Sequence, residues 1–181
     1  MYKVFINPGH APDEWGDPGA TNARLGLKES VIARQIGERA ATYLANVGYD
    51  VRVFQFDGLS EICDAANDWD ADLFVSIHCN AATGKARGTE TYHAPYSAKG
   101  WLLARAIHQQ IIGSIDSGYR WWDRGVKSVG FYVLANTDMP AVLVETAFID
   151  NDDDARLLVE QEDAFARAIA RGVSDFYLQN V

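Results

Sequence analysis

Short apolar runs alternate with segments of helical periodicity along the first half of the chain. The runs typical of buried strands are Val4–Ile6, Val51–Phe54 and Leu73–His78. From Lys28 to Val47, apolar positions recur at helical spacing, and Gly48 follows where a left-handed helix cap is expected. Residues 60–69 predict a shorter helix before the third strand. This strand–helix–strand–helix–strand order predicts parallel βαβ units.

The second half of the chain continues the alternation. Thr89–His93 alternates like a strand, and residues 97–112 follow with helical spacing. Further strands are predicted at 131–134 and 141–144. The acidic run 150–154 contains residues that favour a helix N-cap, and a final helix is predicted from about residue 164. The long aromatic segment 114–127 is predicted to be a functional loop. We expect a single α/β domain over residues 1–181, with an open, twisted, mostly parallel sheet of about six strands and helices on both faces.

Composition limits the partners that this fold could serve. The chain has 181 residues and a formal net charge of −9, which would repel nucleic acid and anionic lipid heads. The first apolar run is too short for a signal-peptide core, and nothing approaches the roughly 18 apolar residues of a membrane span. Cys63 and Cys79 form no CxxC pair, so two reduced thiols and synthesis in the cytoplasm are expected. The sequence leaves the oligomeric state open.

Polar residues collect where the predicted parallel strands end. His10 follows the first strand, His78 ends the third and Glu145 ends the strand 141–144, while Glu29 lies in the first turn of the first helix. Parallel sheets bind ligands at this edge. Each residue alone has an ordinary explanation, as a satisfied strand-end histidine or a glutamate serving the helix dipole. Together, two histidines and one carboxylate make a catalytic zinc site, and the second carboxylate is left as a base.

Two other histidines are excluded from this site. His93 lies on what we expect to be an edge strand, and His108 lies inside an amphipathic helix. A surface role is expected for both.

At these positions the sequence resembles the zinc-dependent N-acetylmuramoyl-L-alanine amidases of the type 3 class. The matching segments, in the family's order, are Ile6–His10, Asp17–Ala20, Leu27–Glu29, Val75–Ala81, Arg124–Lys127, Phe131–Leu134 and Met139–Ile149. The resemblance implies His10, Glu29 and His78 as zinc ligands and Glu145 as the catalytic residue. The chain departs from the family at Cys79, at Ala147 and in the loop from His10 to Asp17, where Pro12–Trp15 replace a short glycine-rich stretch.

The resemblance also implies an activity. Members hydrolyse the amide between N-acetylmuramic acid and L-alanine in bacterial peptidoglycan, with metal-bound water as the nucleophile and Glu145 as the general base. A phage endolysin or a sporulation cell-wall hydrolase fits this expectation. Such an enzyme would be made in the cytoplasm without a signal peptide, and would reach the wall after lysis or holin-type release. No separate wall-binding module is expected within the chain.

Other functions remain open beside the amidase. A zinc peptidase on a similar α/β scaffold would differ in the type of end group that it releases. A non-catalytic peptidoglycan-binding module would stack sugars on Tyr119, Trp121 and Trp122 and keep only a vestigial metal site. A thiol enzyme is disfavoured because His78 and Cys79 are successive strand residues that point to opposite faces. Should Glu145 not be the base, Glu90 is the next candidate. The acidic run at 150–154 lacks the glycine and glutamate that a calcium loop needs.

Overall fold

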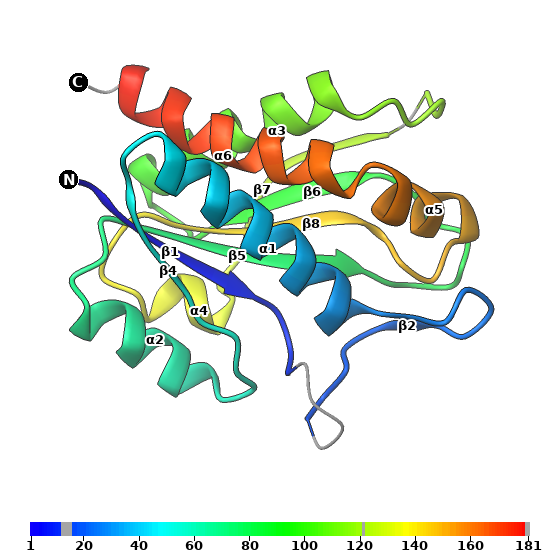
Figure 1. Cartoon of the computed structure of the whole chain (residues 1–181), viewed down its shortest axis with the longest axis horizontal. Helices are drawn as coiled ribbons and strands as arrows, with labels where there is room; N and C mark the ends of the chain where they lie inside the picture. The colour runs from blue at the N-terminus through cyan, green and yellow to red at the C-terminus, as the bar shows by residue number, and fades with distance from the viewer. Residues whose placement is uncertain (12–15, 121, 180–181) are drawn as a thin grey trace.

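The computed structural model describes residues 1–11, 16–120 and 122–179, which contain an open six-stranded sheet (Figure 1). Its strands are β1 (Lys3–Pro8), β4 (Asp50–Val53), β5 (Leu73–Asn80), β6 (Thr89–His93), β7 (Asp123–Ser128) and β8 (Ala141–Phe148). Their order across the sheet is β4-β1-β5-β8-β6-β7. A separate two-stranded ribbon joins β2 (Thr21–Asn22) to β3 (Leu27–Lys28).

Four neighbouring strands of the sheet run parallel. β1 pairs in parallel with both β4 and β5, and β5 pairs in parallel with β8. β6 is antiparallel to β8 and parallel to β7. The predicted α/β class, with one open and mostly parallel sheet, is therefore confirmed.

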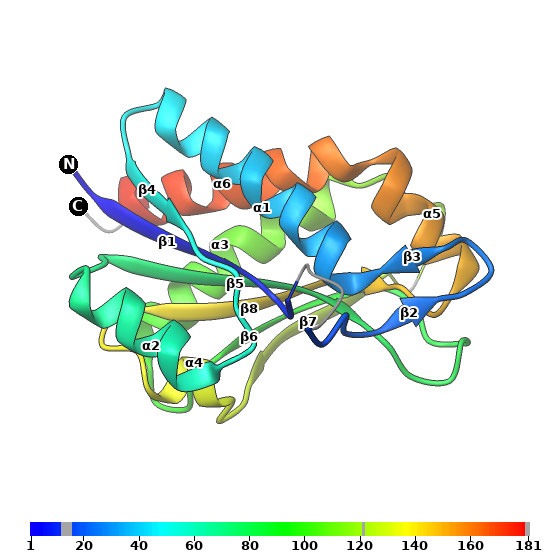
Figure 2. The ribbon, with the colours of Figure 1, turned by 60° about the horizontal axis from the view of Figure 1, so that its bottom comes forward.

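Helices cover both faces of the sheet, as Figures 1 and 2 show from two directions. The helices are α1 (Glu29–Asn46), α2 (Leu59–Asp68), α3 (Ala98–Ser114), α4 (Tyr132–Ala135), α5 (Asp152–Glu160) and α6 (Glu162–Gln179). Alternate strand residues point to opposite faces, so Ile6 and Val75 join the core under α1, α3 and α6. Phe5 and Phe74 face the other way, into a second cluster with α2 and α4. At the end of α1, Gly48 adopts a φ of 97°, the predicted left-handed conformation.

Two predictions are wrong: the strand at residues 131–134 and the loop over the whole of 114–127. Residues 131–134 form no strand but lead into the short helix α4, which buries Val133 and Leu134 beside α2. A four-residue apolar run does not distinguish a strand from a helical turn. The end of the predicted loop is strand β7, which continues to Ser128. β6 is therefore an interior strand and not the expected edge.

The acidic run begins a helix that the sequence analysis did not separate. The Asn151 side chain accepts hydrogen bonds from the backbone N–H groups of Asp153 and Asp154, and so caps α5. The helix expected from about residue 164 begins earlier, at Glu162, as α6. The acidic run thus serves as a helix start, as predicted.

His108 corrects a further expectation. Its side chain is buried rather than exposed, and its ring nitrogens contact Thr91 Oγ1 at 3.1 Å and Asp123 Oδ1 at 2.8 Å. It therefore ties α3 to β6 and β7. Cys63 and Cys79 are free and buried, as expected, and burial raises the pKa of both thiols. Among the described helices, none is both long and apolar enough to cross a membrane.

Candidate metal centre and catalytic site

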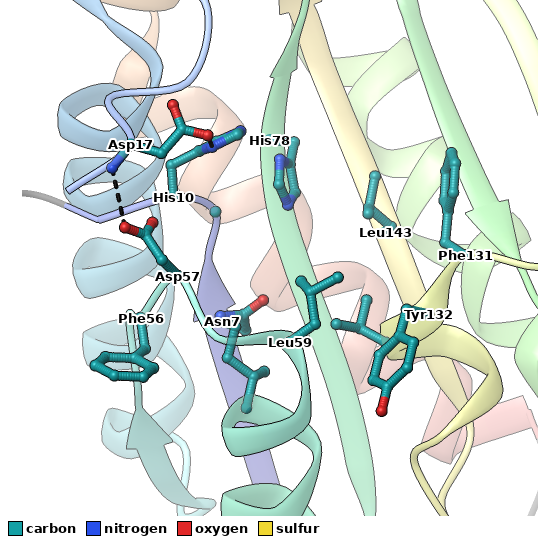
Figure 3. A pocket seen from close by; sticks show the side chains of 13 residues that line it. Asn7, His10, Asp17, Phe56, Asp57, Leu59, His78, Phe131, Tyr132 and Leu143 are labelled. Carbon is teal, nitrogen blue, oxygen red and sulfur yellow. Dashed lines mark hydrogen bonds and ion pairs between the residues drawn. The ribbon is translucent and has the colours of Figure 1, made fainter.

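The four residues singled out in the sequence meet at one edge of the sheet. β1, β5 and β8 are parallel neighbours, so their carboxyl ends lie together. His10 lies just beyond β1, and His78 lies near the end of β5, directly opposite Glu145 of β8. Glu29 is the first residue of α1. Figure 3 shows His10 and His78 among the side chains that line one cleft.

Glu29 bridges the two imidazoles. Its Oε2 lies 3.2 Å from His10 Nε2, and its Oε1 lies 2.9 Å from His78 Nδ1. One donor atom from each of the three residues lies within 4.8 Å of the other two. Two imidazole nitrogens and one carboxylate oxygen at this spacing form a candidate metal site, and this donor set is the one found in catalytic zinc sites.

The backbone around the cluster leaves room only for glycine at two positions. A Cβ atom at Gly9 would overlap the His78 ring, and one at Gly19 would overlap His10 and Glu29. Gly19 also has a φ of 70°, and His10 itself adopts a φ of 61°. A non-glycine residue in this left-handed region is uncommon and costs free energy. The local chain is thus arranged so that both rings approach the same point.

Hydrogen bonds from outside the cluster fix its members. The backbone N–H groups of Ala20 and Cys79 donate to Glu29 at 2.8 Å and 3.0 Å. His10 Nδ1 lies 3.1 Å from Asp17 Oδ2, so a proton on Nδ1 is held by Asp17 and Nε2 faces the centre. Contacts of this kind set the tautomer and orientation of metal-binding histidines.

The charges of the cluster are strongly coupled. The hydrogen bond to Glu29 raises the pKa of His10 to about 9, against the opposing effect of burial. Burial alone would raise the pKa of Glu29, but hydrogen bonds from His10 and His78 hold it well below its usual range. The Glu29 carboxylate thus favours a positive charge on the imidazole that faces it.

Glu145 is the carboxylate that the cluster does not use. Its Oε2 is buried and has no hydrogen-bond partner among the described residues. Burial, together with the negative charges of Glu29 and Glu90, raises the pKa of Glu145 to about 8. A carboxyl in a functional site with a pKa near neutrality can both take and give a proton.

Glu90 follows Glu145 across the sheet, because the two are register partners on β6 and β8. Its buried carboxylate accepts hydrogen bonds from Arg124 Nε at 3.1 Å, from Lys127 Nζ and from Asn80 Nδ2. Burial opposes ionisation of Glu90, but the hydrogen bonds from Lys127 and Arg124 lower its pKa. Glu90 is therefore tied into ion pairs, whereas Glu145 is not. The sequence analysis missed this network, because it predicted a loop where β7 carries Arg124 and Lys127.

A cleft of about 430 Å³ opens beside the two histidines. Figure 3 shows it between the start of α2 and the start of α4. Its walls include Phe56, Leu59, Phe131 and Tyr132, all exposed, and Asp57 with Asp17 borders the end near His10. The cleft gives an extended ligand access to the cluster.

Two of the aromatic residues suggested for sugar stacking, Tyr119 and Trp122, form no open stacking surface. Trp122 is buried and packs against Phe165, with ring centroids 6.3 Å apart, so the stacking role suggested for it is wrong. Tyr119 is half-buried under the guanidinium of Arg87, 4.7 Å from its ring centroid. Trp121 lies outside the described residues.

The chain is similar to known proteins over nearly its whole length. The N-acetylmuramoyl-L-alanine amidase family matches residues 4–175. The sporulation-specific N-acetylmuramoyl-L-alanine amidase of Bacillus subtilis is 37% identical over 95% of this chain, and the endolysin of Bacillus phage SPP1 is 37% identical over 93%. The chain spans 65% of the first protein's length and 62% of the second's. The solved structure of amidase AmiC2 of Nostoc punctiforme superposes with a TM-score of 0.87 at 32% identity, covering 98% of this chain and 97% of that one.

Proposed function

Because the chain belongs to the N-acetylmuramoyl-L-alanine amidase family, we propose that it hydrolyses the amide between N-acetylmuramic acid and L-alanine in bacterial peptidoglycan. One observation carries the proposal. His10, Glu29 and His78 converge at the sheet edge where Glu145 keeps a buried, unpartnered oxygen. A cluster that could hold a metal, with an unengaged carboxylate nearby, is suited to hydrolysing a stable amide.

The residues present fit zinc. His10 Nε2, His78 Nδ1 and one oxygen of Glu29 would be its protein ligands, a set that leaves a further coordination position open. A bound zinc ion supplies a Lewis acid for the scissile carbonyl and lowers the pKa of water towards about 7. Asp17 holds the His10 ring in the tautomer that this role needs.

In this proposal Glu145 is the general base. Its carboxylate takes a proton from the attacking water and passes it to the alanine nitrogen as the carbon–nitrogen bond breaks. Its buried oxygen has no competing hydrogen-bond partner among the described residues, which suits it to both transfers. Glu90 is a poorer candidate because Arg124 and Lys127 already engage its carboxylate.

The cleft would receive the muramyl peptide, and the biological setting would be cell-wall breakdown. The relatives named as a sporulation amidase and a phage endolysin support this setting. For this chain we propose action on the wall after lysis or holin-type release, as an endolysin or a sporulation hydrolase.

The test is the identity of the groups released from purified peptidoglycan. We expect new N-terminal alanine and no rise in reducing sugar, with activity lost to a chelator and restored by zinc. New reducing ends would indicate a glycosidase. New amino termini within the stem, with the lactyl–alanine amide intact, would indicate the zinc peptidase. Binding to the wall without any release would indicate a non-catalytic module.

A further inference from the structure

Two cations lie on the far side of Glu145 from the histidines. Along neighbouring strands, His78 faces Glu145 and Glu145 faces Glu90. Arg124 and Lys127, both on β7, reach back over this face and pair with the Glu90 carboxylate. This side of the site is thus basic, although the whole chain has a formal charge of −9.

The charge of this group is not balanced. Glu90 contributes one negative charge and the two cations contribute two positive charges, so one positive charge remains. The Glu90 side chain is 4% exposed, whereas Arg124 is 34% and Lys127 is 41% exposed. The excess charge is therefore at the surface, where a ligand can reach it. One of the two cations is enough to balance the charge of Glu90, so the other can balance the charge of a ligand.

The Arg124 guanidinium is held in a fixed orientation. It lies over the Phe148 ring at 4.9 Å, donates through Nε to Glu90, and donates through Nη1 to the Arg87 carbonyl at 3.5 Å. These bonds use two of the five N–H groups that a guanidinium carries. The remaining groups can bind a second carboxylate, and an already ordered fork loses little entropy in doing so.

The basic side also connects with the cleft. The Lys127 ammonium lies 5.9 Å from the Tyr92 ring centroid, and the Tyr92 ring meets Phe131 of the cleft wall edge to face at 5.1 Å. The opposite end of the cleft carries Asp17 and Asp57. An acidic ligand would be attracted to the β7 side and repelled from the β1 side.

We propose that Arg124, assisted by Lys127, binds a carboxylate of the peptide that follows the scissile amide, and so selects acidic stem peptides. This inference rests on the proposed amidase function. Glu90 lies two strands from His78, which is about 10 Å at the usual strand spacing. A peptide advances about 3.5 Å per residue, so the carboxylate belongs to the second or third residue of the stem. The acidic residue that follows L-alanine in peptidoglycan meets this requirement.

The test uses two soluble muramoyl tripeptides that differ only at the second residue, which carries a free carboxylate in one and a carboxamide in the other. Binding is measured by calorimetry to zinc-loaded protein with the Glu145→Gln substitution, which prevents turnover. We expect the carboxylate form to bind at least about 10-fold more tightly, as for a hydrogen bond to a charged group. Arg124→Gln in the same protein should reduce this ratio to about 2-fold or less.

Two further variants separate recognition from folding. Arg105→Gln removes an exposed charge from α3, on the other face of the sheet, and should keep the full ratio. Arg124→Lys keeps the charge but loses the fork, and should give an intermediate ratio. If Arg124→Gln does not fold, Lys127→Gln, which should lower the ratio, replaces it.

In the active enzyme, Arg124→Gln should lower kcat/KM about 10-fold for the carboxylate substrate and change it little for the carboxamide. Equal binding of both peptides to the parent protein, or a ratio that survives Arg124→Gln, would overturn the proposal. A purely structural role would weaken both substrates equally. Binding is measured without turnover, so the two proposals are tested separately. Failure to cleave the lactyl–alanine amide would refute the proposed function, whereas the binding ratio tests only the recognition of the carboxylate.

Discussion

Replacing Glu145 by glutamine tests the assignment of the general base most directly. The carboxamide has nearly the same shape but accepts no proton at neutral pH. We expect peptidoglycan hydrolysis to fall by two or more orders of magnitude, as losses of general acid–base catalysis do. Zinc content should stay at the wild-type level, because His10, Glu29 and His78 keep their mutual contacts without Glu145.

The same substitution should change stability in a pH-dependent way. In the metal-free fold the pKa of Glu145 is raised from 4.5 to about 8, so the folded state holds a proton that the unfolded chain has released. The free energy of unfolding therefore falls as pH rises from about 4.5 through 8. At about 1.36 kcal/mol per pKa unit, the buried carboxylate destabilises the fold by about 3 kcal/mol at pH 7 and about 4 kcal/mol at pH 8. Glutamine lacks this penalty.

Urea denaturation of chelator-treated protein at pH 5.5 and pH 8 measures the effect. The stability of the Glu145→Gln protein relative to wild type should increase by about 3 kcal/mol between the two pH values. Glu160→Gln makes the same chemical change at an exposed position at the end of α5 and serves as the matched control. A pH-independent difference for Glu145→Gln, or near-normal turnover, would refute the reasoning and move the role elsewhere.

Three further predictions concern the surroundings of the site. Gly9→Ala should abolish zinc binding while the fold persists, because the added Cβ atom would overlap the His78 ring. Mass spectrometry measures the metal content, and an unchanged content would contradict this prediction. Zinc should bind more weakly at pH 6 than at pH 8, because the pKa of His10 is raised to about 9 without metal and zinc must displace its proton. Calorimetry in buffers of different ionisation enthalpy measures the protons released on binding. No proton release would contradict the prediction. Asp154→Asn should lower the free energy of unfolding by about 3 kcal/mol, because the buried Asp154 carboxylate pairs with Arg87. Asp153→Asn, at an exposed position of the same helix, should change it little. Equal effects of the two substitutions in urea titrations would contradict this prediction.

The elements that the sequence predicted well are those with long, regular patterns. α1 and the strands β1, β5 and β8 bury continuous apolar faces, and their positions follow from periodicity. β7 was missed because its sequence, Asp-Arg-Gly-Val-Lys-Ser, contains three charged residues and a single apolar side chain. None of its residues is buried, so the strand needs no apolar pattern. Residues 131–134 were misassigned because four apolar residues carry too little periodicity.

The convergence of the candidate metal ligands was predictable for a different reason. The parallel order of β1, β5 and β8 brings His10, His78 and Glu145 to one edge whatever the details of packing. The basic group around Glu90 could not be found this way. It depends on the register of β6 against β8 and on the pairing of β7, and neither follows from the pattern of single segments.

The contrast between the two carboxylates of the site supports their different roles. Glu29 receives hydrogen bonds from two backbone amides and contacts two imidazoles, so its negative charge is stabilised and its pKa is lowered. Glu145 has a buried oxygen without a partner and two neighbouring carboxylates, so its charge is penalised and its pKa is raised. A ligand must remain ionised, whereas a base must exchange protons near neutral pH. The surroundings of each residue thus suit Glu29 to bind a cation and Glu145 to transfer a proton, and exchanging the two roles would require both environments to be rebuilt.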